Sequence, residues 1–177
     1  GDYIPPSTSV IMEELLTARA DITASLLAVV PGAGREPKRV ATPQVTAPVW
    51  SGFVPAVTSG DFVFVAGQMA RGVDGNADPR AHVPAHSRWG GYEIHRQTEY
   101  LIREKFVPAL KAAGSSLANA VKAQVYLRDI DDTAHFLDVW DSHFGARQCA
   151  LTIVPTKDFG LVPGIIEINL IALTDAG

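Results

Sequence analysis

The sequence is poor in three features, each of which would indicate a particular class of protein: cysteine, long apolar runs and clustered positive charge. Its single cysteine, Cys149, excludes an internal disulfide and a multi-cysteine zinc site. No apolar stretch approaches the roughly 20 residues that a membrane-spanning helix needs. The first residues also lack the basic region and apolar core of a signal peptide. We therefore expect a soluble, cytoplasmic protein that has no membrane partner.

The charge of the chain argues against a nucleic-acid partner. Lysine and arginine number 15 against 19 aspartates and glutamates, which gives a net charge of −4. Binding to phosphates normally requires a basic face that displaces counterions, and no run of lysine or arginine supplies one. We expect no nucleic-acid partner, and ribonuclease activity finds no support in this composition.

The remaining composition, 47% hydrophobic and 19% charged residues over 177 positions, is typical of a globular chain with one well-formed core. From Lys38 onward, the hydrophobic periodicity predicts the order β-β-β-α-β-α-β-β. We therefore predict an α+β domain with a mixed sheet of about six strands and two helices packed on one face. Five of these six strands have expected bounds, at 52–57, 61–68, 120–127, 149–154 and 164–173. The helices are expected over 92–113 and from 131 or 132 to 144.

Two of these elements carry further expectations. In the first helix, Pro108 should produce a kink or a break, and Gly114 should end the helix in a left-handed conformation. In the last strand, alternate positions point to opposite faces, so Glu167 and Asn169 should lie on the face away from the core. The apolar side chains of the core face are Ile166, Ile168, Leu170 and Ala172.

Arg147 stands at the entrance of the apolar run "CALTIV", where a permanent positive charge requires an anionic partner. The residue pattern leaves two partners open. A substrate carboxylate would make Arg147 a binding residue, whereas an ion pair with Glu167 across neighbouring strands would make it a structural one. In an extended chain, Cys149 would share a face with Arg147. No histidine lies near Cys149 in sequence, which favours an apolar wall residue over a nucleophile.

Several stretches together carry a resemblance to a known family. They are "SGFVPAV", "GDFVFVAGQMA", "ALKAAGSSLANAVKAQVYLRDIDD", "ARQCALTIV" and "IEINLIAL", in this order. Residues 38–177 thereby resemble the Rid (YjgF-type) family of reactive-intermediate imine/enamine deaminases. The resemblance implies a chorismate-mutase-like fold and a trimer-like oligomer, homo- or heteromeric, with active sites between subunits.

The resemblance also implies a set of site residues. Arg147 matches the arginine that binds the substrate carboxylate, and Glu167 matches the glutamate that positions or activates water. Neither a metal nor a cofactor is implied. The pocket is expected to include Phe53, Gly67, Gln68 and Cys149.

Departures from the family pattern affect the expected substrate. Phe53 replaces a tyrosine and Leu137 replaces an asparagine that is frequent in the deaminases, so two polar groups are missing. The loop 71–91 is also longer than usual. We therefore expect a larger or more apolar substrate than the small 2-imino acids.

The histidines favour structural interpretations. The spacing of His82 and His86 suits a metal ligand pair, but both stand in a proline-rich loop that need not direct them to one point. His135 and His143 flank the second helix and are expected at the surface or at an interface.

The start of the chain aligns weakly with its end. Ser7 falls opposite Arg147, and Thr23 falls opposite Glu167, so this copy lacks both proposed active residues. We interpret the segment as strands of a preceding Rid-like domain that has lost its site, in a tandem protein cleaved ahead of Gly1. Because unpaired strand edges are a liability in water, we expect a second chain that supplies the missing part. The expected divisions are a closing β-hairpin at 1–30, a linker at 31–37 and a complete domain at 38–177.

The sequence thus predicts a hydrolase of a degradative pathway that converts an imine or enamine of a carboxylic acid to the oxo acid and ammonia. The alternative, from another class, is a non-catalytic Rid-like subunit that binds a small ligand or stabilises a partner chain.

Overall fold

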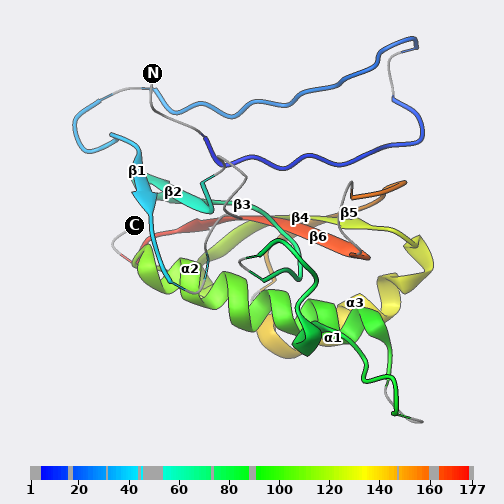
Figure 1. The fold of residues 1–177 in the computed structure, drawn as a ribbon. Helices are drawn as coiled ribbons and strands as arrows, with labels where there is room; N and C mark the ends of the chain where they lie inside the picture. Colours follow the sequence, from blue (N-terminus) through cyan, green and yellow to red (C-terminus); the bar gives the residue numbers. More distant parts are fainter. Residues whose placement is uncertain are drawn as a thin grey trace.

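The computed structural model describes residues 5–15, 18–30, 32–43, 45, 54–72, 74–87, 91–146, 148–159 and 164–175. A single six-stranded sheet forms one layer, and the helices cover one of its faces (Figure 1). This arrangement confirms the predicted α+β architecture. The strands are β1 Lys38–Val40, β2 Ala56–Ser59, β3 Phe62–Gln68, β4 Ala120–Leu127, β5 Ala150–Pro155 and β6 Ile166–Leu173.

The strands follow one another across the sheet in the order β1-β2-β3-β6-β4-β5. The β4–β5 pair is parallel, and the other neighbouring pairs are antiparallel. The predicted hairpin before residue 68 is present, although β2 begins later than expected. Its turn contains Gly60, whose φ of 57° lies in the left-handed region that favours glycine.

The helical layer contains two long helical segments. α1 (Glu93–Tyr100) continues through a π-helical stretch, Leu101–Phe106, into α2 (Val107–Ala112), and α3 (Thr133–Phe144) packs beside α1. The predicted disturbance at Pro108 takes the form of this π-helical stretch. Its wider turns accommodate the proline ring and the missing N–H, so the helical segment continues through α2, which includes Pro108 (Figure 1). Gly114, with φ of 69°, follows the end of α2 as expected.

The hydrophobic core lies between the helices and one face of the sheet. The four apolar residues predicted on β6 are all 0% exposed, which confirms the alternation. From α3, Trp140 packs its ring on Phe144 with the ring centroids 4.0 Å apart. No helix in the described ranges has the length and apolar character to cross a membrane, and the cytoplasmic location stays a prediction.

The described parts of the first thirty residues form no β-hairpin. Two arms, residues 5–15 and 18–30, run along the side of the sheet opposite the helices (Figure 1). Within them no strand forms, and the only ladder contact is an isolated bridge between Ile11 and Asp158. Because a strand requires a hydrogen-bonded neighbouring strand, the single bridge at Ile11 is not enough to form one in these arms. The assignment of 1–30 to a preceding domain stays a prediction.

We expect Trp140→Ala to lower the free energy of unfolding by about 3–5 kcal/mol, because the fully buried ring would leave a cavity against Phe136 and Phe144. The measurement is urea unfolding at fixed protomer concentration. Val107→Ala is the matched control on an exposed helical position and should change stability by less than about 1 kcal/mol. Equal midpoints for Trp140→Ala and the parent protein would contradict the assignment of the core.

Candidate active site

Glu167 is the predicted site residue whose surroundings the structure defines best. It lies on β6, directly opposite Tyr126 of β4, and its side chain points to the open face of the sheet, meaning the face opposite the helices. Although this face carries no helices, Glu167 is only 6% exposed. The carboxylate is therefore buried on the side of the sheet where no hydrophobic core would require it.

A β-bulge in the neighbouring strand provides part of this burial. The register between β3 and β6 shifts between Val65 and Gln68, which places Gly67 beside the carboxylate. A Cβ at Gly67 would overlap Oε1 of Glu167 and would lie 2.8 Å from Oγ1 of Thr8. Glycine is thus the residue that lets the carboxylate approach the β3 backbone, as the predicted pairing of Gly67 and Glu167 in one pocket requires.

The first N-terminal arm covers the same site. The N–H of Gly67 donates to the carbonyl of Ser7 at 3.2 Å, and Nδ2 of Asn169 donates to Oγ1 of Thr8 at 3.2 Å. Farther along, Oγ1 of Thr156 donates to the carbonyl of Ile11 at 2.6 Å. Residues 7–11 therefore lie across the open face at the level of Glu167 and exclude water from it.

Burial changes the acid–base behaviour of the carboxylate. Removal from water raises the pKa of Glu167 to about 7, and the nearby charge of Arg71 offsets only part of this effect. Burial also raises the pKa of Tyr126, with the negative charge of Glu167 acting in the same direction. Glu167 consequently exchanges its proton near neutral pH, as a general acid or base requires.

Arg71 is a functional candidate that the sequence patterns did not single out. It follows β3 by three residues, and it is partly buried in a position where its charge acts on Glu167. The signal was available, because Arg71, like Arg147, is a lone arginine next to an apolar strand. The family motifs stop at "GQMA", one residue before it.

The remaining predicted site residues separate into two groups. Gln68 pairs with Ile168 on the core side of the sheet, and its Nε2 donates to the carbonyl of Ala66 at 3.3 Å. Cys149 belongs to the main hydrophobic core, where burial raises the pKa of its thiol, as suits an apolar wall residue. Both side chains are therefore buried on the helix-covered side of the sheet, away from Glu167. Arg147 and Phe53 lie outside the described residues.

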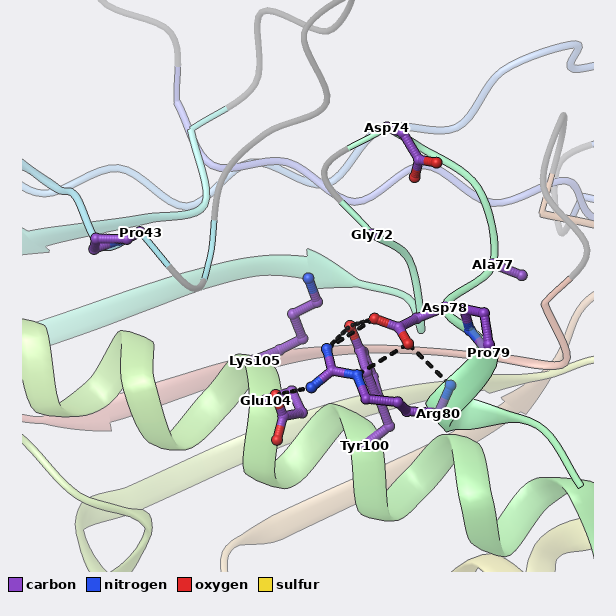
Figure 2. A pocket seen from close by; sticks show the side chains of 10 residues that line it. All are labelled: Pro43, Gly72, Asp74, Ala77, Asp78, Pro79, Arg80, Tyr100, Glu104 and Lys105. Atoms are coloured by element: carbon purple, nitrogen blue, oxygen red, sulfur yellow. Dashed lines mark hydrogen bonds and ion pairs between the residues drawn. The ribbon is translucent and has the colours of Figure 1, made fainter.

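The long loop predicted over 71–91 begins at Arg71, whose charge acts on Glu167, and its described residues 74–87 contact the helical layer instead. Figure 2 shows Asp78 accepting hydrogen bonds from Arg80 and from the hydroxyl of Tyr100, while Arg80 also pairs with Glu104. These contacts attach the loop to the helical layer and surround a cavity of about 540 Å³ that Glu167 does not line. Because Arg80 on its wall already pairs with Asp78 and Glu104, this cavity is a weak candidate for the active site. Lys105, nearly fully buried, also lines it.

We expect Gly67→Ala to displace the Glu167 side chain and the arm together, and to lower the free energy of unfolding by about 1–3 kcal/mol. Gly32→Ala is the matched control, because the nearest atom to its added Cβ lies 3.9 Å away. Urea unfolding of both variants provides the comparison. Equal stability of the two variants would show that Gly67 does not confine the carboxylate.

The pKa of Glu167 predicts a pH-dependent stability. The folded pKa of about 7 exceeds the ordinary 4.5, so the folded state binds the additional proton, and stability falls as the pH rises from about 4.5 through 7. The loss assigned to Glu167 should reach up to about 3 kcal/mol. It is measured as the difference between the parent protein and Glu167→Gln in urea unfolding from pH 5 to 8. Parallel profiles would contradict the raised pKa.

Comparison with known proteins places this geometry in context. Residues 44–174 match the family described as Endoribonuclease L-PSP. A RutC family protein of Pyrococcus horikoshii is 31% identical over 121 residues, covering 66% of this chain and 82% of the relative. The mitochondrial protein mmf2 of Schizosaccharomyces pombe is 35% identical over 119 residues, covering 66% of this chain and 83% of the relative.

Solved structures share the fold at lower identity. Yeast Mmf1 superimposes with a TM-score of 0.65 at 24% identity, covering 79% of this chain and 100% of that one. RidA from an Antarctic Psychrobacter gives 0.62 at 23% identity, covering 77% and 98%. Escherichia coli TdcF with bound serine gives 0.61 at 20% identity, covering 78% and 100%. The match over residues 44–174, supported by the curated relatives, shows that the chain belongs to the Endoribonuclease L-PSP (YjgF/Rid) family.

Proposed function

We propose that the protein hydrolyses an imine or enamine of a 2-oxo acid to the oxo acid and ammonia. The observation that carries the proposal is the buried carboxylate of Glu167, whose pKa of about 7 suits proton transfer at neutral pH. Membership of the L-PSP family, to which the Rid proteins belong, supports this reaction class. The serine in the TdcF structure is a ligand with the same 2-amino acid framework.

In the proposed reaction, the ionised Glu167 carboxylate accepts a proton from water while the water oxygen attacks C2 of the protonated imine. A carbinolamine forms, and the carboxyl group then returns the proton to nitrogen. As the C2–N bond breaks and ammonia leaves, the carboxylate takes the hydroxyl proton and passes it to the ammonia, so C2 becomes the carbonyl of the oxo acid. Water and the protonated imine account for every atom of the oxo acid and the ammonium ion, and the carboxylate is regenerated.

Two arginines act in this proposal, one on the substrate carboxylate and one on the carboxylate of Glu167. Arg147 is the anchor that the family resemblance assigns, and its planar guanidinium would bind a carboxylate through two parallel hydrogen bonds. Arg71 is a positioning residue, because its charge favours the ionised Glu167 that attack requires. Burial lowers the pKa of Arg71, which nevertheless stays cationic at any physiological pH.

Access to Glu167 requires residues 7–11 to move, because they lie against Gly67 and Asn169. The two arms also expose large apolar side chains, with Ile22 and Leu26 at 84% and 88% exposure. Exposed apolar groups of this kind favour contact with another chain. We propose that the working protein is an oligomer in which a neighbouring subunit or a second chain binds the arms and closes the site.

The family description and the non-catalytic alternative define the competing functions. Ribonuclease activity is disfavoured by the net charge of −4, because RNA binding gains much of its free energy from cationic side chains. A binding protein without turnover would use the same anion site, but it would not need a carboxyl group that exchanges protons near pH 7.

The test follows the hydrolysis of 2-imino acids generated in situ from leucine and from alanine by an amino acid oxidase. We expect Glu167→Gln and Arg147→Ala each to lower the rate by about 10²-fold or more, and the leucine-derived imine to be preferred. Glu104→Gln is the control, because this carboxylate lies in the helical layer and pairs with Arg80. Its rate should equal that of the parent protein.

Other outcomes identify the competing functions. Binding of a 2-oxo acid by calorimetry, with imine decay no faster than in buffer, would identify a non-catalytic ligand-binding subunit. Cleavage of single-stranded RNA that Glu167→Gln abolishes, without imine turnover, would identify a ribonuclease. Either result would overturn the deaminase proposal.

A further inference from the structure

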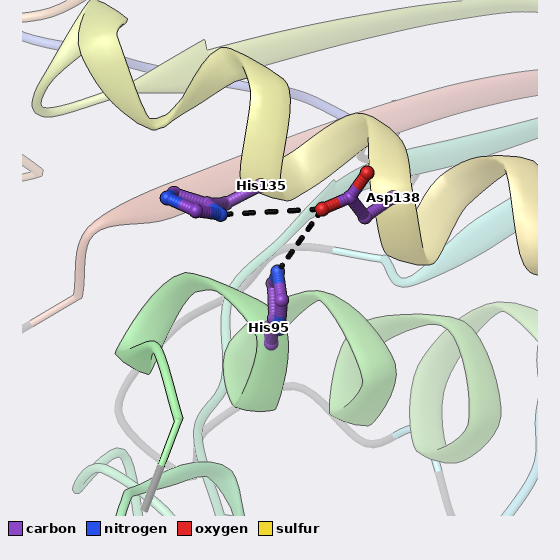
Figure 3. A group of neighbouring side chains, drawn as sticks. All are labelled: His95, His135 and Asp138. Carbon is purple, nitrogen blue, oxygen red and sulfur yellow. Dashed lines mark ion pairs between the residues drawn. The ribbon is translucent and has the colours of Figure 1, made fainter.

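Three potential metal ligands converge where α1 packs against α3. Figure 3 shows His95 of α1 facing His135 and Asp138, which lie three residues apart on one side of α3. Oδ2 of Asp138 lies 3.8 Å from Nε2 of His95 and 4.0 Å from Nδ1 of His135. One potential ligand atom from each of the three residues lies within 4.8 Å of the others.

The group leaves one polar atom unsatisfied. Nε2 of His95 is buried and has no hydrogen-bond partner, since 3.8 Å to Asp138 is too long for a hydrogen bond. Such buried nitrogens require an explanation, and a bound ion is one of the usual ones. The ring of Tyr92 stacks on His135 with the centroids 3.6 Å apart, and its centroid lies 5.3 Å from that of His95, so the two imidazoles are oriented before any ion arrives.

We propose that His95, His135 and Asp138 bind one divalent transition-metal ion, with zinc as the best-suited metal. Two imidazoles and one carboxylate form a ligand set of the kind zinc takes, whereas magnesium and calcium prefer oxygen ligands. Ligands about 2.0–2.1 Å from a tetrahedral zinc ion lie about 3.3–3.4 Å apart, so the two separations from Asp138 need to shorten by about 0.5–0.7 Å. The Asp138 side chain is 70% exposed and can make this adjustment, and its exposure gives the ion a path from solvent.

The position of the group indicates its role. It lies in the helical layer, whereas Glu167 faces the opposite side of the sheet, so the ion would not take part in imine hydrolysis. It would instead link α1 to α3. The same two helices are joined elsewhere by a hydrogen-bonded ion pair, in which Nε2 of His143 lies 2.6 Å from Oε2 of Glu99. That pair serves as the natural control, because it has similar ligand types and only one histidine.

The experiment is calorimetric titration of zinc into tag-free protein that has been treated with a chelator and dialysed. We expect one zinc ion per chain, and a loss of affinity of at least about tenfold in His135→Gln and in Asp138→Asn. His143→Gln should bind zinc as the parent protein does. Zinc should raise the melting temperature of the parent protein and of His143→Gln, but not that of His135→Gln. Magnesium should have no effect.

Unchanged zinc affinity in both His135→Gln and Asp138→Asn would overturn the proposal, as would an equal loss in His143→Gln. The absence of zinc binding at millimolar concentration would do so as well. Asp138→Asn protects the test against misfolding, because this exposed side chain can be changed without disturbing the core.

Discussion

Burial of the Glu167 carboxylate against the β3 backbone is the constraint on which the rest of the site depends. A carboxylate removed from water must gain compensating charge or take up a proton. Arg71 provides part of the compensation, and protonation near neutral pH provides the remainder. The bulge at Gly67 and the covering arm both follow from this requirement, because each excludes water from a group on a face that has no helices. The contacts of Glu167 with the Gly67 bulge and the covering arm therefore both hold the carboxylate in place and keep water away from it.

The two faces of the sheet carry different kinds of side chain and have different roles. The face under the helices contains the large apolar side chains and most of the folding free energy, while the open face contains polar groups such as Tyr126, Glu167 and Asn169. Period-two alternation along β6 alone produces this division. A substitution on one face can therefore alter chemistry with little effect on the core. The proposed link between His95 and α3 belongs to the core side and concerns stability and assembly.

Patterns in the sequence predict most of the fold, because hydrophobic periodicity, turn glycines and family motifs depend on local physics. Alternation identified the core face of β6, and Gly114 marked the end of the first helical segment. Contacts between residues far apart in the sequence were harder to predict from these patterns. The contact of Thr8 with Asn169 joins residues 161 positions apart, and no local pattern encodes it. The family resemblance groups Gln68 and Cys149 with Glu167, although the structure buries both side chains on the core side of the sheet. For Arg71 the sequence shows a lone arginine next to an apolar strand, but not that its charge acts on Glu167 of a distant strand.

The strand order has a consequence for folding kinetics. β6 is the last of the six strands in chain order, yet it lies between β3 and β4 and pairs with both. Until β6 arrives, β3 and β4 each expose an unpaired edge, and about a hundred residues separate β3 from its partner. Closing such long loops is entropically costly and slows folding. The nascent chain therefore passes through a stage in which two apolar strand edges await one segment, and this stage is its period of greatest exposure to aggregation and to chaperones.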